Sequence, residues 1–170
     1  LGGHAIGLSG MDGHMIKCKP LDNEHGYVGE IIETNMEVVE EVLANNFIPV
    51  ISTIGYDEKG NCYNINADTV AAQIAGDLKA TALISMTDIV GLLRDVHDES
   101  TKIQRVLISE IPALIADGII SGGMIPKIDS MTQAIRNGCE KAFIIDGRIP
   151  HSILMELLTD EGLGTMFRSR

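Results

Sequence analysis

Residues 121–146 read SGGMIPKIDSMTQAIRNGCEKAFIID, and this stretch contains one complete unit of a pattern that runs through the chain. A glycine-rich turn comes first, and a helix is predicted over 127–137 with Gly138 as its C′ residue. An apolar strand over 141–146 follows at once. Helices that lead straight into apolar strands are typical of α/β proteins, in which helical crossovers connect parallel strands.

The same alternation extends in both directions from this stretch. Strands are predicted over 4–10, 47–54, 81–86 and 103–108, and helices over 35–46, 66–79, 109–118 and 151–158. Asp12-Gly13 predicts a hairpin turn, and the tail from Gly164 is expected to add an edge strand. We therefore predict an α/β fold, a three-layer α/β/α sandwich with a mostly parallel sheet.

Ligands bind beyond the carboxyl ends of the strands in such sheets. The segments that follow strands here are 55–68, 87–93, 119–127 and 146–151. No GxxxxGK[ST] and no strand-linked GxGxxG occurs, so neither a P-loop nor a dinucleotide-binding fingerprint is predicted.

Composition argues against several classes of partner. The net charge of −11, without clustered Lys and Arg, argues against nucleic acid. No apolar run approaches the roughly 18 residues of a membrane span, so no membrane partner is predicted. Three widely spaced cysteines (Cys18, Cys62, Cys139) predict reduced thiols and a cytoplasmic location, and the isolated histidines predict no metal site.

The segment Asn64-Ile65-Asn66-Ala67-Asp68 lies where a short strand gives way to an alanine-rich helix. All three polar residues favour helix N-termini, so simple capping is one interpretation. The other is functional: Asn64 offers its amide to a substrate, and Asp68 orients cationic side chains. One cap suffices for a helix, so the repeated polar residues favour the second interpretation.

The segment Ser121–Lys127 delivers a lysine at a predicted helix start. A solvated lysine after a flexible connection is the simple alternative. However, a cation at a helix N-terminus opposes the helix dipole, and a bound anion is a common reason for such a placement. The adjacent Gly122 and Gly123 also predict a close approach of the backbone to another group.

Two further segments carry weaker signals. Thr87–Gly91 follows an apolar strand and suits a nucleotide base or ribose, although many connecting loops contain Asp and Gly. Near the end, His151 and the segment 160–165 combine acidic and glycine residues. They are either a solvated turn or a site for a guanidinium, which pairs well with a carboxylate.

Taken in order, these motifs resemble the C-terminal portion of the acetylglutamate kinases within the amino-acid kinase family. The matching stretches are Gly7–Gly13, Gly26–Glu30, Ile48–Ser52, Asn64–Asp68, Leu83–Leu92, Gly122–Lys127 and Asp160–Met166. The resemblance implies ATP-dependent phosphorylation of the side-chain carboxylate of N-acetyl-L-glutamate in arginine biosynthesis, with Mg²⁺ accompanying ATP. It also implies that residues 1–80 are the remainder of an incomplete acylamino-acid-binding lobe and that residues 81–170 form a nucleotide-binding lobe.

The resemblance implies a role for each matched position. Asn64 would bind the acylamino acid, Asp68 would position the catalytic lysines, and Lys127 would neutralise charge on the transferred phosphoryl group. The implied nucleotide-binding residues are Asp88, Ile89, Val90, Gly91, Leu92, Leu93, Ile119, Ile120 and Ser121. An arginine effector site is implied at His151, Glu161, Gly162 and Gly164, in a full-length protein that is expected to be a homo-oligomer.

The family's early Lys-x-Gly-Gly turn and substrate-gripping arginine have no match in these 170 residues. The chain begins at Leu1, so we expect a truncated or processed piece of a longer enzyme, inactive by itself. Two alternatives stay open. One is another member of the family, such as an aspartate, carbamate or uridylate kinase, and the other is a nucleotide- or arginine-sensing module without catalysis.

Overall fold

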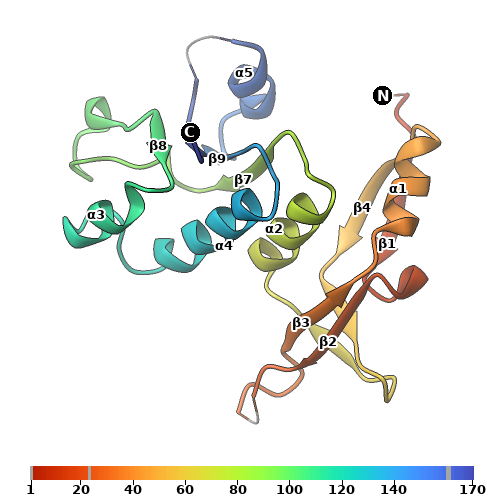
Figure 1. Ribbon diagram of the computed structural model, residues 1–170. Coiled ribbons are helices and arrows are strands. Elements are labelled where there is room, and N and C mark those ends of the chain that lie inside the picture. Colours follow the sequence, from red (N-terminus) through yellow and green to blue (C-terminus); the bar gives the residue numbers. More distant parts are fainter. Residues whose placement is uncertain (1, 23, 160–161) are drawn as a thin grey trace. The chain divides into compact units, whose positions relative to one another are not determined.

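The computed structural model describes residues 2–22, 24–159 and 162–170 (Figure 1). The chain divides into two compact units, Leu1–Val70 and Ala71–Arg170. The sequence places the boundary near residue 80, ten residues later. The assignment of an acylamino-acid lobe and a nucleotide lobe to the two parts of the chain stays a prediction.

Unit 1 contains a parallel pair of strands next to one helix. Strand β1 (Ala5–Ser9) pairs with β4 (Ile48–Ser52), with Ala5 opposite Ile48. Helix α1 (Glu37–Ala44) precedes β4, and Met36 is its N-cap residue. The Asn35 side chain, one residue earlier, accepts a hydrogen bond from the Glu37 N–H at 3.0 Å. The apolar sequence of 47–54 would suit a buried strand, but Ile48 and Val50 of β4 are each 59% exposed.

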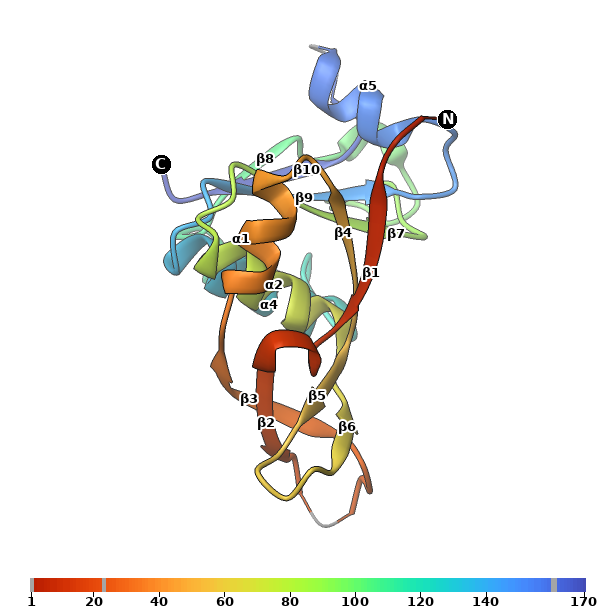
Figure 2. The same ribbon diagram turned by 90° about the vertical axis from the view of Figure 1, so that its right-hand side faces the viewer.

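A second, four-stranded sheet completes unit 1 (Figure 2). Its order is β3 (Gly29–Thr34), β2 (Ile16–Pro20), β5 (Ile54–Tyr56) and β6 (Cys62–Asn64), with only β2 and β5 parallel. The predicted Asp12-Gly13 hairpin is wrong. Asp12–His14 form a short 3-10 turn, and the strands on either side of it pair elsewhere.

Unit 2 contains one four-stranded sheet in the order β7 (Leu83–Thr87), β9 (Lys141–Asp146), β10 (Thr165–Arg168) and β8 (Arg105–Leu107). Strand β7 runs parallel to β9, and β8 runs parallel to β10. Strand β10 is antiparallel to β9. The C-terminal strand was expected at an edge but lies inside the sheet.

Helices cover both faces of this sheet. Helices α3 (Ile111–Ala116) and α4 (Met124–Arg136) bury their apolar side chains against the face that carries Ala142, Ile144 and Phe167. Helix α5 (Ser152–Leu158) lies on the opposite face (Figure 1). Helix α2 (Ala67–Asp77) packs its small residues Ala72 and Ala75 against Ala134. The predicted α/β class with mainly parallel pairing is confirmed.

Within residues 2–22, 24–159 and 162–170, every helix lacks the combination of length and apolar composition that a membrane crossing needs. Cys18, Cys62 and Cys139 are all free thiols.

Candidate functional site

The carboxyl ends of β7 and β9 lie side by side in unit 2, and Lys127 of helix α4 contacts β7 two residues before its end. Thr87 is in register with Asp146, and Ser85 with Ile144. The Lys127 ammonium donates a hydrogen bond to the Ser85 hydroxyl at 3.2 Å. The structure therefore places this cation on the sheet face that α4 covers, close to where the two strands end.

Helix α4 begins earlier than the sequence predicts. Met124 is its first residue, so Lys127 is the fourth and lies at the end of the first turn. Pro126 is tolerated because backbone N–H groups of a first turn have no intrahelical acceptor. Gly122 has a φ of +55°, and a Cβ there would meet nothing within 4 Å. The glycine satisfies the backbone conformation rather than a close approach within the chain.

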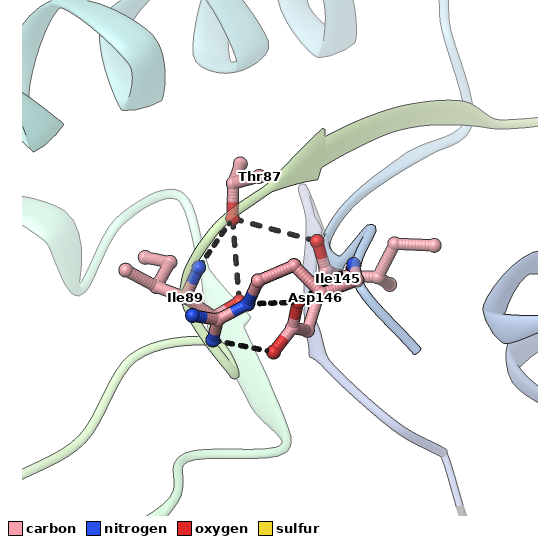
Figure 3. A network of polar contacts seen from close by, with 5 residues as sticks. Thr87, Ile89, Ile145 and Asp146 are labelled. Atoms are coloured by element: carbon pink, nitrogen blue, oxygen red, sulfur yellow. Dashed lines mark hydrogen bonds and ion pairs between the residues drawn. The ribbon is translucent and has the colours of Figure 1, made fainter. Parts of the chain in front are cut away.

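The segment after β7 is tied to β9 by hydrogen bonds (Figure 3). The Thr87 hydroxyl accepts a hydrogen bond from the Ile89 N–H at 3.1 Å and lies 3.4 Å from the Ile145 carbonyl oxygen. The Gly147 N–H donates to the Thr87 carbonyl at 2.8 Å. These contacts connect the loop after β7 to the end of β9.

The predicted nucleotide-binding segment Asp88–Leu93 has both open and buried parts. Asp88 is exposed, and Ile89, Val90 and Leu93 are half-buried. Gly91 (φ +124°) and Leu92 are buried, and the Leu92 N–H donates to the Thr165 hydroxyl at 2.8 Å. Leu92 fills the core of unit 2, so it contributes to the site through its backbone position.

The second predicted nucleotide segment joins α3 to α4. The N–H groups of Ile119 and Ile120 both donate to the Leu114 carbonyl, at 3.0 and 3.1 Å. Ile120 is buried in the core, and Ser121 is exposed. The apolar side chains of this segment therefore pack against the core of unit 2, and Ser121 is exposed shortly before α4 begins.

Sequence reasoning missed an ion pair at the end of β9. Asp146 is only 5% exposed and accepts three hydrogen bonds from Arg148: from its backbone N–H at 2.9 Å, Nε at 2.9 Å and Nη2 at 2.8 Å. The Arg148 side chain is the main reason why the pKa of Asp146 is lowered to about 2. An Asp-x-Arg sequence directly after a buried strand is the signal that could have revealed it.

Unit 1 carries the other predicted site residues. The Asn66 side chain accepts hydrogen bonds from the N–H groups of Asp68 and Thr69, at 3.0 and 3.2 Å, so Asn66 is the cap of α2. Asn64 is exposed on β6, and Asp68 is half-buried in the first turn of α2. The expected meeting of Asp68 with Lys127 stays a prediction, because the two residues belong to different units.

Of the predicted effector residues, Gly162 and Gly164 lie together at one cavity. Gly162 and Gly164 line a cavity of about 460 Å³ on the α5 side of the sheet, together with Arg105, Lys141, Phe143 and Glu156. The Glu156 carboxylate accepts hydrogen bonds from the Leu163 and Gly164 N–H groups at 2.6 and 2.9 Å. His151 does not line this cavity, and it is exposed with a φ of +62°. Glu161 lies outside the described residues.

No group of three or more His, Cys, Asp or Glu side chains that could hold a metal ion occurs in the described part of the chain. A Mg²⁺ ion that arrives with a nucleotide keeps several waters and binds largely through the phosphates, so it does not need such a group.

Comparison with known proteins identifies the relatives of this chain. The model of the amino acid kinase family matches residues 2–146. Acetylglutamate kinase from Clostridium beijerinckii is 52% identical over 168 residues, which are 97% of this chain and 59% of that protein. Acetylglutamate kinase from Actinobacillus pleuropneumoniae serotype 5b is 53% identical over 169 residues, which are 98% of this chain and 59% of that protein.

Solved structures agree on the fold. The structure of smu.665 from Streptococcus mutans is 30% identical, with a TM-score of 0.79, and the match covers 99% of this chain and 62% of that one. N-acetylglutamate synthase from Neisseria gonorrhoeae, 22% identical, shares the fold with a TM-score of 0.83 over 99% of this chain and 38% of its own. The chain thus spans about 60% of the length of the curated relatives it matches.

Proposed function

Because the chain belongs to the amino acid kinase family, we propose that the full-length protein phosphorylates the side-chain carboxylate of N-acetyl-L-glutamate with ATP. The observation that carries this proposal is the identity of about 50% to acetylglutamate kinases over nearly the whole chain. The reaction is a step of arginine biosynthesis, and we place it in the cytoplasm. The relatives are longer than this chain, so activity is expected of the full-length protein.

The reaction requires the protein mainly to position the two substrates and to neutralise charge. The attacking carboxylate is ionised at neutral pH, so no general base is needed. Phosphoryl transfer is promoted mainly by in-line placement and by groups that neutralise charge on the equatorial oxygens. A lysine, a positioning carboxylate and an amide meet these needs.

We assign these roles to Lys127, Asp68 and Asn64. Lys127, tied to Ser85 on β7, neutralises charge on the transferred phosphoryl group from the nucleotide side. Asp68 organises the cations and is not a proton acceptor. Asn64 offers its amide to the acylamino acid, and this side chain is exposed and makes no hydrogen bond to another described residue.

The nucleotide is expected along Asp88–Leu93 and Ile119–Ser121, at the carboxyl end of β7 and before α4. Ligand sites of open α/β sheets lie at such places. Mg²⁺ bound to the phosphates would neutralise part of their charge.

The test measures ADP release that depends on N-acetyl-L-glutamate, together with trapping of the acyl phosphate by hydroxylamine, in the full-length protein. Lys127→Ala should lower turnover by about 10²–10³-fold, as loss of other charge-stabilising groups does, with little change in thermal stability. Arg136→Ala, an equal loss of charge in the last turn of the same helix, is the matched control. Absence of acetylglutamate-dependent ADP release would refute the proposed function.

The 170-residue chain itself should bind ATP without turning over. Robust acetylglutamate phosphorylation by the purified chain would contradict this expectation. ATP binding without turnover in the full-length protein would instead favour the sensing module. Faster turnover of aspartate, carbamate or uridylate would favour another member of the family.

One observation favours an additional regulatory site for L-arginine. Gly162 and Gly164 line the cavity under α5, and the Glu156 carboxylate in its wall suits a guanidinium. We propose that arginine binds there in the full-length protein, as an inhibitor of a homo-oligomeric enzyme. Unchanged activity of that enzyme at saturating arginine would remove this part of the proposal.

A further inference from the structure

Arg148 presents a guanidinium with one edge fixed and the other edge open. The Nε and Nη2 atoms donate to Asp146, which leaves three of the five guanidinium N–H groups for other partners. The side chain of Asp146 is 6% exposed, whereas that of Arg148 is 66% exposed. The buried carboxylate therefore sets the orientation of the guanidinium, and the remaining donors face outward.

The place of this ion pair in the sheet relates it to Lys127. Residues paired between parallel strands, and residues two apart along one strand, point to the same face. Ser85 is the partner of Lys127, and Asp146 pairs with Thr87, which lies two residues further along β7. Asp146 thus lies on the same face as the Lys127 contact, about 7 Å closer to the carboxyl end of the sheet.

A structural role accounts for the edge of the guanidinium that pairs with Asp146, but not for the open edge. The backbone N–H of Arg148 already closes the turn on Asp146, at 2.9 Å. The ion pair stabilises the ionised form of the buried Asp146 carboxylate, but ordering the long, largely exposed Arg148 side chain costs conformational entropy. An anionic ligand that binds the open edge would explain why these donors are held in a fixed orientation.

The surrounding charges indicate how such a ligand would be held. Asp146 is the largest cause of the raised pKa of Arg148, and Asp88 and Glu99 add to it, so the guanidinium keeps its charge. The carboxylates of Asp146, Asp88 and Glu99 offset that charge at long range, so Arg148 acts through directed hydrogen bonds rather than general attraction. A guanidinium fork matches the geometry of phosphate oxygens.

We propose that Arg148 is a further nucleotide-binding residue, which contacts the α-phosphate end of the bound nucleoside triphosphate. This inference rests on the proposed function, in which Lys127 lies at the transferred phosphoryl group. The contacts of Lys127 and Arg148 are two residues apart along the sheet, so we expect the guanidinium to bind the same nucleotide at the end next to the Asp88–Gly91 segment. Asp146 is its positioning residue.

The test is calorimetric titration of the 170-residue chain with ATP, ADP, AMP and adenosine, in the presence of Mg²⁺. Arg148→Ala should weaken ATP, ADP and AMP by a similar factor of about ten and leave adenosine unchanged. Lys127→Ala should weaken ATP more than ADP or AMP, because its contact is with the terminal phosphoryl group. Arg148→Lys, which retains charge without the fork, should fall between the unsubstituted chain and Arg148→Ala.

Arg136→Ala is again the matched control, since it removes a guanidinium from the other end of α4 and should change no affinity. Normal affinities for Arg148→Ala, together with weakened ATP binding by Lys127→Ala, would overturn this inference and leave the proposed function intact. Equal weakening of ATP and adenosine would overturn the phosphate contact. Absence of nucleotide binding by the unsubstituted chain would overturn both the inference and the proposed nucleotide site.

Discussion

Gly164, immediately before β10, has no room for a side chain. It is buried, and a Cβ at this position would overlap the carbonyl oxygen of Ile144 and lie 2.8 Å from the Cγ2 of Ile145. The obstacle is backbone, which cannot rotate away as a flexible side chain can. Gly164→Ala should therefore push the start of β10 away from β9.

The size of the effect follows from the contacts that this movement disturbs. Overpacking of a well-packed core costs about 1–3 kcal/mol. The shift also strains the hydrogen bonds of the Leu163 and Gly164 N–H groups to Glu156, and losing one hydrogen bond to a charged group costs about 1.5–3 kcal/mol. We expect a loss of about 3 kcal/mol, which lowers Tm by about 6–12 °C in a protein of this size.

Differential scanning calorimetry of the 170-residue chain measures the shift, with urea unfolding followed by circular dichroism as a second reading. Gly7→Ala is the matched control, because a Cβ in that exposed position of β1 would meet nothing within 4 Å. It should change the free energy of unfolding by less than about 0.5 kcal/mol. Tyr27, Tyr56 and Tyr63 all lie in unit 1, so tyrosine fluorescence reports that unit separately. A Tm for Gly164→Ala within 2 °C of the unsubstituted chain would refute the steric argument.

Three further outcomes are expected. Asn66→Ala should destabilise the chain by about 1 kcal/mol, since it removes the cap of α2, whereas Asn66→Asp should retain most of the stability in a thermal melt. Thr165→Val should cost about 1–3 kcal/mol in urea unfolding, because it leaves the buried Leu92 N–H without its acceptor, and no loss would contradict that role of the hydroxyl. The pKa of Asp146 is about 2 in the folded chain, below its ordinary value of 3.8, so its stabilising effect is present above about pH 4 and is lost as pH falls toward 2. Asp146→Asn should therefore show a smaller drop in urea midpoint between pH 5 and pH 2.5 than the unsubstituted chain, and an equal drop would count against the ion pair.

The sequence predicts the positions of helices and strands in this chain better than it predicts which strands pair with each other. Strand β9 and the C′ glycine at Gly138 follow from apolar periodicity and from a residue suited to positive φ, which are local properties. The interior position of β10 is a matter of long-range pairing, and a four-residue strand carries no local mark of it. Asp12-Gly13 was overridden in the same way, because tertiary pairing of β1 with β4 outweighs a turn propensity.

The candidate site shows a similar division. Lys127 was recognisable because a cation near a helix start opposes the helix dipole. Arg148 was not, because its significance depends on the burial of Asp146 and on the register of Thr87 with Asp146, and neither is visible in a linear pattern. Gly164 was predicted as an effector contact, whereas its packing against Ile144 already requires a glycine at this position.

The interior place of β10 also bears on how the polypeptide matures during translation. Strand β8 leaves the ribosome almost sixty residues before β10, the strand with which it pairs. At a synthesis rate of about 5–20 residues per second, β10 is synthesised some 3–12 seconds after β8. During this interval the backbone groups of β8 around Val106 are unpaired and can pair with other nascent chains. The yield of native protein should therefore depend on chaperones that cover this short segment until synthesis passes Arg168.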